Sequence, residues 1–285
     1  MINEPVIACV DGSPFSMSVC DYAVWAAGRL DAPLTLVHAL DHRHAAAPAD
    51  LSGSIGVGSQ EALLEQLAAH DQLTGKLALE RGRHLLEGAR ARVVFQGAGE
   101  PSVRQVHGSL VDLLVEQEAA ARLFVIGKRG EGAHRAQDHL GSNLERVIRA
   151  VHRPVLVVPA EYREPASFML AFDNGPSTRK GVEVLMRGPL FRGLACHLVT
   201  AGEAEGELRD AHAWARTQLE SAGFAVHGGV FSGEAEAVLT SYQRDHGVDL
   251  VVMGAYGHSR IRQLLVGSTT SAMIRHVESP LLLLR

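Results

Sequence analysis

The chain has 285 residues, of which 46% are hydrophobic and 21% are charged, and its formal net charge is -5 at pH 7. This composition excludes a disordered chain, which would be poorer in apolar residues and richer in charge. The small negative charge also gives no electrostatic footprint for nucleic acid or for an anionic membrane.

Short apolar runs alternate with helical patterns along the chain, which predicts βαβ units and a parallel sheet. Several runs, such as residues 250–253, are apolar without alternation, as expected for strands covered by helices on both faces. The expected strands lie near residues 5–10, 34–39, 102–107, 122–127 and 154–158, and then near 168–172, 194–200, 225–231, 249–254 and 280–284.

An insertion separates the second and third expected strands. Residues 42–59 are rich in Ala, Gly, Ser and Pro, which predicts a loop. From Glu61 onward, leucines recur at a broken helical spacing. The loop is either a surface segment or a lid over a ligand, and the first alternative is the commoner one.

The chain also contains an internal repeat, which is best sought before any other pattern. Residues 141–158 align with residues 267–284 without a gap. Both segments read Gly-Ser, a short helix, a proline and an apolar strand. The apolar runs that end at Asp11 and Asp173 match as well, because each leads through a turn into a helix.

The repeat predicts two homologous domains, residues 1–160 and 161–285. The boundary lies in the polar, proline-flanked stretch 160–165. The first domain is longer because it carries the insertion at about residues 42–60. The length of the chain agrees with this division, since about 150 residues is an ordinary domain size.

A glycine-rich pattern follows the fourth expected strand of the second domain. Gly254-Ala255-Tyr256-Gly257 is separated by nine residues from Gly267-Ser268-Thr269. Glycines at the carboxyl end of a strand let the backbone approach a ligand closely. A helix start offers free N–H groups and its positive dipole end to a phosphate, and Asp173 could accept hydrogen bonds from a nucleoside. Each part alone also fits an ordinary turn or N-cap, so the prediction rests on the combination.

At these residues the sequence resembles the universal stress protein family in its tandem form. Nucleotide-binding members carry Gly-x2-Gly-x9-Gly-Ser/Thr, and residues 254–268 match this spacing. Asp11 and Asp173 match the aspartate that ends the first strand in the family. The resemblance covers nearly the whole chain. It implies an α/β fold of two tandem, doubly wound, five-stranded parallel-sheet domains, Rossmann-like and similar to adenine nucleotide alpha hydrolases, paired through their final strands as a pseudo-dimer.

The resemblance further implies a ligand and a role: ATP or a related adenine nucleotide, bound by a regulatory stress-response protein. Any Mg²⁺ that accompanies ATP would be held by the phosphate oxygens and water rather than by a protein cage. In the family, the backbone just after the second strand also meets the base, and Thr200 and Ala39 are the approximate matches. The nucleotide-binding residues expected in the second domain are Asp173, Thr200, Gly254, Gly257, Gly267, Ser268 and Thr269. Those expected in the first domain are Asp11, Ala39, Gly127, Gly130, Gly141, Ser142 and Asn143.

The first domain departs from the family pattern. Ten residues, one too many, separate Gly130 from Gly141, and Asp138 among them would repel a phosphate if it faced the site. Lys128 and Arg129 either offset this charge or lie on the solvated surface, and the second alternative is the commoner one. Nucleotide binding by the first domain therefore stays open.

The sequence does not indicate an efficient enzyme. It has no Walker motif, no kinase catalytic loop and no clear base to activate water on a γ-phosphate, so no catalytic residue is predicted. Slow ATP hydrolysis or self-phosphorylation, with Ser268, Thr269 or Thr270 as acceptor, is compatible with the resemblance. The alternative function is a non-catalytic interaction or scaffold protein of the same fold, with one or both nucleotide sites degenerate.

Metal, membrane and compartment predictions follow from simpler features. His42 and His44 form the only tight histidine pair, and a structural metal site needs about four ligands, so no metal site is predicted. No basic leader precedes the first strand, and no apolar stretch reaches the length of about 20 residues that spans a bilayer. The three widely spaced cysteines predict free, buried thiols and a reducing, cytoplasmic setting. The protein partner, and a further homodimer of tandem chains, are left open.

Overall fold

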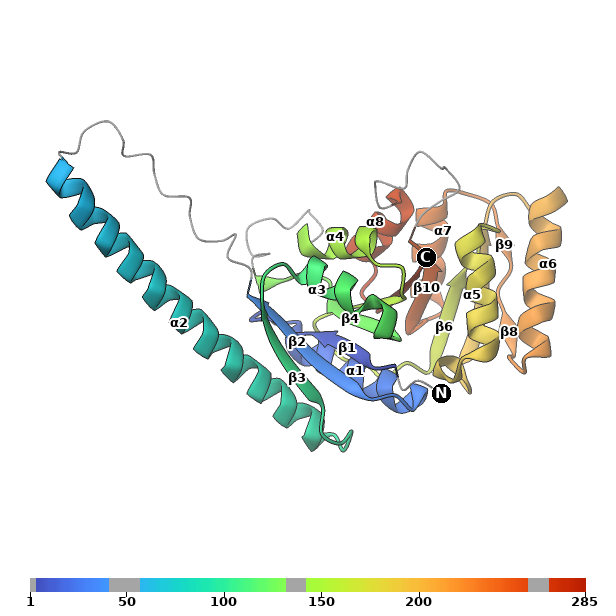
Figure 1. Cartoon of the computed structure of the whole chain (residues 1–285). Coiled ribbons are helices and arrows are strands. Elements are labelled where there is room, and N and C mark those ends of the chain that lie inside the picture. Colours follow the sequence, from blue (N-terminus) through green and yellow to red (C-terminus); the bar gives the residue numbers. More distant parts are fainter. Residues whose placement is uncertain (1–3, 41–56, 132–141, 256–266) are drawn as a thin grey trace.

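The computed structural model describes residues 4–40, 57–131, 142–255 and 267–285. Among these residues, eleven strands form one sheet in the order β3-β2-β1-β4-β5-β11-β10-β6-β7-β8, and β9 pairs with β7 off this path. We call β1 to β5 with their helices the first half of the chain, and β6 to β11 with theirs the second half. Figure 1 shows the two halves side by side along the sheet.

The elements of the first half follow the predicted βαβ alternation. They are β1 (Val6–Cys9), α1 (Ser16–Leu30), β2 (Leu34–Leu40), α2 (Val57–Phe95), β3 (Ser102–His107), α3 (Leu110–Gln117), the 3-10 helix η2 (Glu118–Ala120), β4 (Leu123–Gly127), α4 (Ser142–Ala150) and β5 (Val155–Val158).

The second half repeats this succession. Its elements are β6 (Ser167–Ala171), α5 (Pro176–Arg187), the 3-10 helix η4 (Pro189–Phe191), β7 (Ala195–Ala201), α6 (Gly206–Ser221), β8 (Val226–His227), β9 (Val230–Phe231), α7 (Ala235–Asp245), β10 (Leu250–Gly254), α8 (Ser268–His276) and β11 (Leu281–Leu284).

Strand order within each half creates a switch point. All pairings inside a half are parallel, and β1 lies between β2 and β4 as β6 lies between β7 and β10. The chain therefore leaves the first strand of each half to one side and returns on the other. In such sheets, ligands bind beyond the carboxyl ends of the strands that flank this point. The prediction of an α/β fold with two doubly wound, parallel halves is confirmed, and the two halves share one continuous sheet.

The two halves meet at an antiparallel seam between their final strands. β5 pairs with β11 through Leu156 opposite Leu282, Val157 opposite Leu281 and Val155 opposite Leu283. All of these side chains are buried. The final strands of the two halves pair as the family resemblance implied.

Side chains from each half also hold a helix end in the other half. The Lys128 ammonium donates to the carbonyl of Val277, just past α8. The Arg285 guanidinium donates to the carbonyls of Arg149 and Val151 at the end of α4, at 2.7 and 3.1 Å. Cations suit the negative ends of helices. The interpretation of Lys128 as solvated surface is wrong, because this side chain spans the seam, where burial lowers its pKa to about 8.

Two layers of helices cover the sheet, and each layer continues across the seam. Helices α1, α2, α5 and α6 pack on one face, and α3, α4, α7 and α8 pack on the other. Cys9, Cys20 and Cys196 are free and buried in this core, as predicted, and burial raises the pKa of each thiol to about 12. No helix within the described ranges combines the length and the apolar character needed to cross a bilayer.

The third strand of the second half departs from the prediction. Residues 225–231 form two short strands, β8 and β9, instead of one. Gly228 between them has a φ of +92°, and a Cβ at this position would lie 2.4 Å from the carbonyl oxygen of Leu198. The close approach to β7 and the left-handed backbone at this glycine divide the strand.

Helix α2 is longer and more regular than the sequence indicated. It runs without a break over 39 residues, or about 58 Å at the rise of an α-helix. Leu86, Ala89 and Val93 bury its C-terminal part, whereas Leu73 and Leu77 are exposed on the part that projects beyond the body in Figure 1. The broken leucine pattern therefore reflects exposure rather than a broken helix. Of the loop predicted at 42–59, residues 57–59 are helical and the rest lies outside the described residues.

An ion pair docks the buried part of α2 on α1. The Arg92 guanidinium donates from Nε and Nη2 to the two carboxylate oxygens of Asp21, both at 2.5 Å, and Gln96 donates to the same carboxylate. Only 5% of Asp21 is exposed, so the pair neutralises a buried charge.

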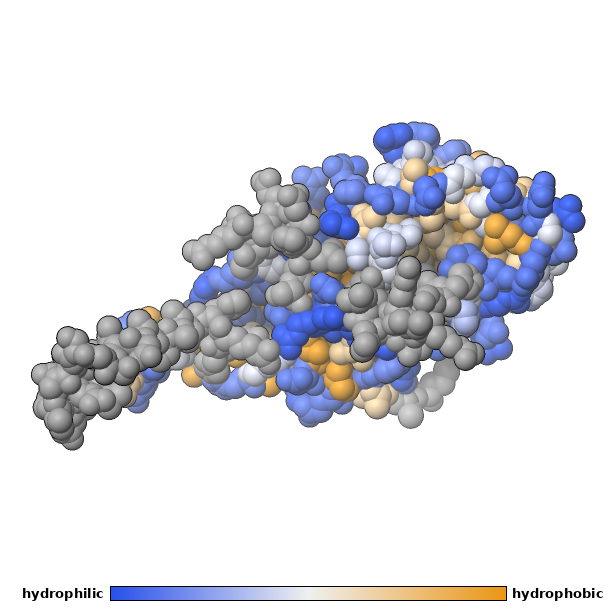
Figure 2. All heavy atoms as spheres, turned by 90° about the horizontal axis from the view of Figure 1, so that it is seen from above, coloured by the Kyte–Doolittle hydropathy of each residue, from blue (hydrophilic) through white to orange (hydrophobic). Residues whose placement is uncertain are grey.

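Most of the described surface seen from above is hydrophilic, with hydrophobic residues in small groups (Figure 2).

Candidate functional site

The switch point of the second half is marked by Asp173, directly beyond β6. Its Oδ1 accepts hydrogen bonds from the N–H of Gly175 at 2.9 Å and from Oγ1 of Thr178 at 2.7 Å. Asn174, between Asp173 and Gly175, has a φ of +64°. This turn fixes the exposed carboxylate of Asp173 at the carboxyl edge of the sheet, between the ends of β7 and β10.

The glycine-rich pattern brings the start of α8 to the same edge. Gly254 ends β10, the strand next to β6, and its carbonyl accepts a hydrogen bond of 3.1 Å from Oγ1 of Thr270 in the first turn of α8. Gly267 is the N-cap residue of α8, and no side chain among the described residues caps the helix. Ser268 is exposed and Thr269 is half-buried. The prediction that Gly267-Ser268-Thr269 opens a helix is confirmed.

Thr200 and Ala39 lie within strands rather than after them. Thr200 is the sixth residue of β7 and is fully buried, with Oγ1 2.9 Å from Nδ1 of His212 on α6. Its backbone N–H donates to the carbonyl of Gly229. Ala39 is paired with Val106 in the ladder between β2 and β3. The Thr200 side chain is therefore part of the core.

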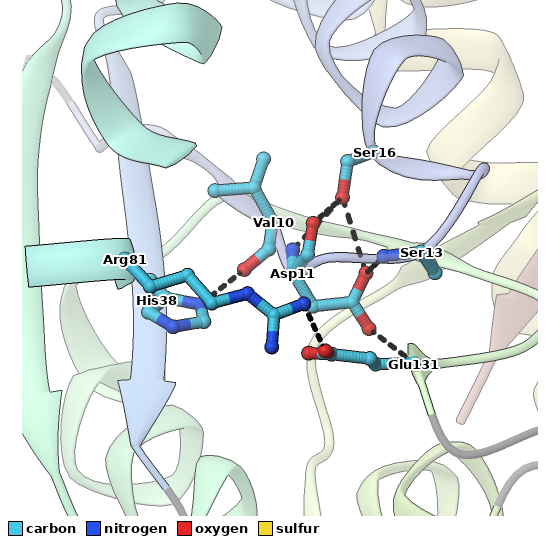
Figure 3. Close-up of polar contacts among 7 residues, drawn as sticks. All are labelled: Val10, Asp11, Ser13, Ser16, His38, Arg81 and Glu131. Atoms are coloured by element: carbon cyan, nitrogen blue, oxygen red, sulfur yellow. Dashed lines mark hydrogen bonds and ion pairs between the residues drawn. The ribbon is translucent and has the colours of Figure 1, made fainter. Parts of the chain in front are cut away.

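The first half builds the same turn after β1. Oδ1 of Asp11 accepts from the N–H of Ser13 at 3.0 Å and from Oγ of Ser16 at 3.1 Å, whereas Oδ2 accepts from the N–H of Glu131 at 3.1 Å (Figure 3). Asp11 thus joins the end of β1 to the segment that follows β4. A Cβ on Gly130 would lie 3.1 Å from Oδ2 of Asp11, so these two predicted residues are brought together.

An ion pair that the sequence analysis did not single out, Arg81 with Glu131, lies across this turn. Arg81 of α2 forms an ion pair with Glu131, and Figure 3 shows the pair beside Asp11. His38 on β2 lies next to it, with Nδ1 2.8 Å from the carbonyl oxygen of Val10. A pair separated by 50 residues leaves no signal in a local motif, so only the fold reveals it.

Only some of the remaining predicted residues lie within the ranges that the structure describes. Gly127 ends β4, and a Cβ there would lie 2.6 Å from Cβ of Phe15. Ser142 and Asn143 open α4, as their counterparts open α8. The predictions for Gly141 and Gly257, and those for Asp138, His42 and His44, fall outside the described residues.

A histidine cluster at the β8 end of the sheet was also missed. His197, His227 and His246 gather around Tyr242, whose hydroxyl lies 3.0 Å from Nδ1 of His197 and whose ring stacks on His246 at 3.9 Å between centroids. These residues line a shallow hollow with Phe231. The three histidines come from β7, β8 and the residue after α7, so their spacing in sequence carries no motif. Among the residues that the structure describes, no three His, Cys, Asp or Glu side chains are grouped to hold a metal ion.

Acidification below about pH 6.5 is expected to destabilise the protein through two histidines of the second half. Burial lowers the pKa of His197, and neighbouring His227 and His246 lower it further. Burial also lowers the pKa of His212, with a contribution from Arg216. In the unfolded chain these histidines have their ordinary, higher pKa. Below about pH 6.5 the unfolded chain therefore binds more protons than the folded one, and the free energy of unfolding decreases as the pH is lowered.

The urea midpoint of tryptophan fluorescence, compared between about pH 7.5 and about pH 5.5, measures this effect. The variant His212→Gln should lose less stability than the wild type over the same interval, because one proton-binding group is gone. Equal midpoints at the two pH values would contradict the assignment.

Comparisons with known proteins agree with one another. The model of the universal stress protein family matches residues 3–159 and 196–285. Universal stress protein Slr1230 of Synechocystis sp. is 36% identical over 289 residues, which cover 98% of this chain and 99% of that protein. Universal stress protein Rv1996 of Mycobacterium tuberculosis is 22% identical over 201 residues, 67% of this chain and 61% of that protein. A universal stress protein structure from Archaeoglobus fulgidus, 15% identical, matches 99% of this chain and 96% of its own with a TM-score of 0.70, which shows the shared fold.

The matched family segments contain the glycine-rich pattern of each half. They include Asp11 but not Asp173, because the second segment begins at residue 196, within β7. The placement of Asp173 at the switch point therefore rests on the structure and on the internal repeat.

Proposed function

Because this chain belongs to the universal stress protein family, we propose that it binds ATP in its second half and acts as a regulator in a stress response. We also place the protein in the cytoplasm, where three free thiols are stable.

One observation carries the proposal: the first turn of α8 lies against Gly254 at the carboxyl end of β10, the strand that pairs with β6 and therefore flanks the switch point marked by Asp173. The N–H groups of such a turn and its positive dipole end suit the phosphates of a nucleotide. Gly267 and Gly254 keep side chains away from this approach, and the hydroxyl of exposed Ser268 adds a donor. The carboxylate of Asp173, held by Gly175 and Thr178, accepts hydrogen bonds from the nucleoside.

The mechanism that fits these groups is occupancy. ATP bridges the end of β6 and the start of α8, and thereby favours one arrangement of this edge over others. A protein partner that binds one of these arrangements more tightly than the other would then bind according to whether ATP is present. Mg²⁺ would be held by the phosphates and by water, as is usual for this ion, rather than by a cage of side chains.

Substitutions at the helix start are expected to weaken ATP binding without unfolding the chain. Gly267 has φ -55° and ψ 143°, a conformation that valine adopts, so Gly267→Val adds bulk at the phosphate approach without backbone strain. Ser268→Ala removes one donor to a charged group, which corresponds to about a tenfold loss of affinity.

Titration calorimetry with ATP measures both variants, and Ser271→Ala, one turn further along α8, is the matched control. Thermal melting verifies that each variant is folded. If ATP binds to Gly267→Val and Ser268→Ala as it does to the wild type, the phosphates lie elsewhere and the assignment is wrong.

A scaffold function without nucleotide is the second candidate, and the first half favours it for its own site. There, Asp11 is already bonded through both carboxylate oxygens, and Arg81 and Glu131 lie across the turn. Mass spectrometry of small molecules released from the purified, denatured protein separates the two functions. Released adenine nucleotide supports the first, and its absence together with no binding in the titration supports the second.

A further inference from the structure

We propose that Arg81 and Glu131 form a plug that closes the first-half crevice, so that each chain binds a single nucleotide, in its second half. This inference rests on the proposed function. It assigns the long helix α2 a role in ligand stoichiometry, because α2 brings Arg81 to the carboxyl edge of the first half.

The position of the pair carries the argument. A Cβ built on Gly12, the residue after Asp11, would lie 2.6 Å from Nη2 of Arg81 and 2.9 Å from the carboxyl group of Glu131. Both side chains therefore rest against the backbone of the turn that a ligand would have to approach. Figure 3 shows the Arg81 guanidinium reaching from α2 across this turn toward Glu131.

The electrostatics add to the steric effect. The N–H of Glu131 already occupies Oδ2 of Asp11, the oxygen not used by the turn itself. The carboxylate of Glu131 also pairs with the Arg81 guanidinium, and this offsets a positive charge that would otherwise attract a phosphate.

Helix packing, rather than the ion pair, holds the plug in place. Arg81 and Glu131 have side chains that are 61% and 45% exposed, and exposed pairs contribute little to stability. One residue further along α2, a Cβ on Gly82 would lie 2.4 Å from Gln105 and 2.7 Å from His38, so the helix is seated directly against β2 and β3. The Nε2 of Gln105 also donates to the carbonyl of Leu79 at 3.0 Å. Truncating the two plug side chains should therefore open the crevice without releasing α2.

The second half has no equivalent helix extension among the described residues. Helix α6 takes the place of α2 between the second and third strands but has only 16 residues, and it begins at Gly206 with a φ of +50°. Counted back from its last residue, α6 also spans the position that Arg81 has in α2, but it carries Glu207 there. The second half therefore has no counterpart of the Arg81 guanidinium at this position, and the two halves differ in access to a ligand.

Equilibrium titration of the full chain with ATP tests the plug. The wild type should bind about one ATP per chain, and Arg81→Ala/Glu131→Ala should bind about two, with the added site the weaker one. The matched control is Arg83→Ala/Glu87→Ala, an exposed pair on the same helix at 3.7 Å, which should leave the stoichiometry unchanged. Thermal melting of each variant establishes that it is folded.

A third variant separates failure of the plug from failure of the proposed function. Adding Gly267→Val to Arg81→Ala/Glu131→Ala should remove the second-half site and leave only the weaker one. Two ATP molecules on the wild type, or an unchanged or lower stoichiometry in Arg81→Ala/Glu131→Ala, would overturn the plug while the ATP proposal stands. A wild type that binds no ATP overturns the proposed function, and binding that appears only after truncation of the pair would still support the plug.

Discussion

Replacing Arg92 by alanine is expected to lower the free energy of unfolding by about 3 kcal/mol. The guanidinium neutralises Asp21, of which only 5% is exposed, through two hydrogen bonds of 2.5 Å. Removing it leaves a carboxylate in the interface between α1 and α2 with Gln96 as its remaining side-chain donor. The cost is therefore mainly that of an unpaired buried charge rather than the loss of an attraction.

Urea unfolding monitored by circular dichroism measures the change. The matched control is Arg90→Ala, on the same helix, because Arg90 pairs with Glu100 where both side chains are more than half exposed, and such pairs are worth less than about 1 kcal/mol. The double variant Asp21→Leu/Arg92→Met should recover most of the loss, since it removes both charges. Equal effects of Arg92→Ala and Arg90→Ala would show that Asp21 is not buried against α2.

Truncation of Leu282 to alanine is expected to cost about 3 kcal/mol and to destabilise both halves together. Leu282 lies in β11, opposite Leu156 of β5, and is 2% exposed. Because the sheet and both core layers continue through this seam, a cavity there weakens structure on either side of it. We therefore expect one cooperative unfolding transition for the described body.

The two tryptophans allow each half to be observed separately. Trp25 lies on α1 in the first half and Trp214 on α6 in the second, so the backgrounds Trp214→Phe and Trp25→Phe each report one half by fluorescence. Leu282→Ala should lower both midpoints by similar amounts, whereas Leu77→Ala, an exposed position on α2, should change neither. Separate transitions, or a shift of the Trp214 signal alone, would show that the seam does not couple the halves.

Much of this architecture follows from local sequence. Apolar runs such as Leu250-Val251-Val252-Met253 predicted their strands, and the repeat of Gly-Ser, helix, proline and strand predicted two similar halves. The helix start at Gly267-Ser268 was predicted in the same way, because a cap and its first turn are neighbours in the chain. Features whose parts are adjacent in sequence were therefore within reach.

Features that depend on tertiary packing could not be predicted from the sequence. Gly228 divides a strand only because its backbone approaches Leu198, which no local pattern reveals. Lys128 stands in a glycine-rich segment that suggested a surface loop, yet its partner is a carbonyl 149 residues away in the other half. The pair of Arg81 with Glu131 depends on where α2 crosses the edge of the sheet. Such contacts are set by the tertiary fold, and sequence spacing carries no trace of them.

The antiparallel seam has a consequence for how two ligand sites in one chain would influence each other. The switch-point strands β1 and β6 are separated by β4, β5, β11 and β10, or about 24 Å at the usual spacing of strands. At physiological ionic strength, charges are screened over about 8 Å, so phosphates in one crevice exert almost no field on the other. Any cooperativity between the halves would have to travel as a mechanical displacement through the packed contacts that cross the seam.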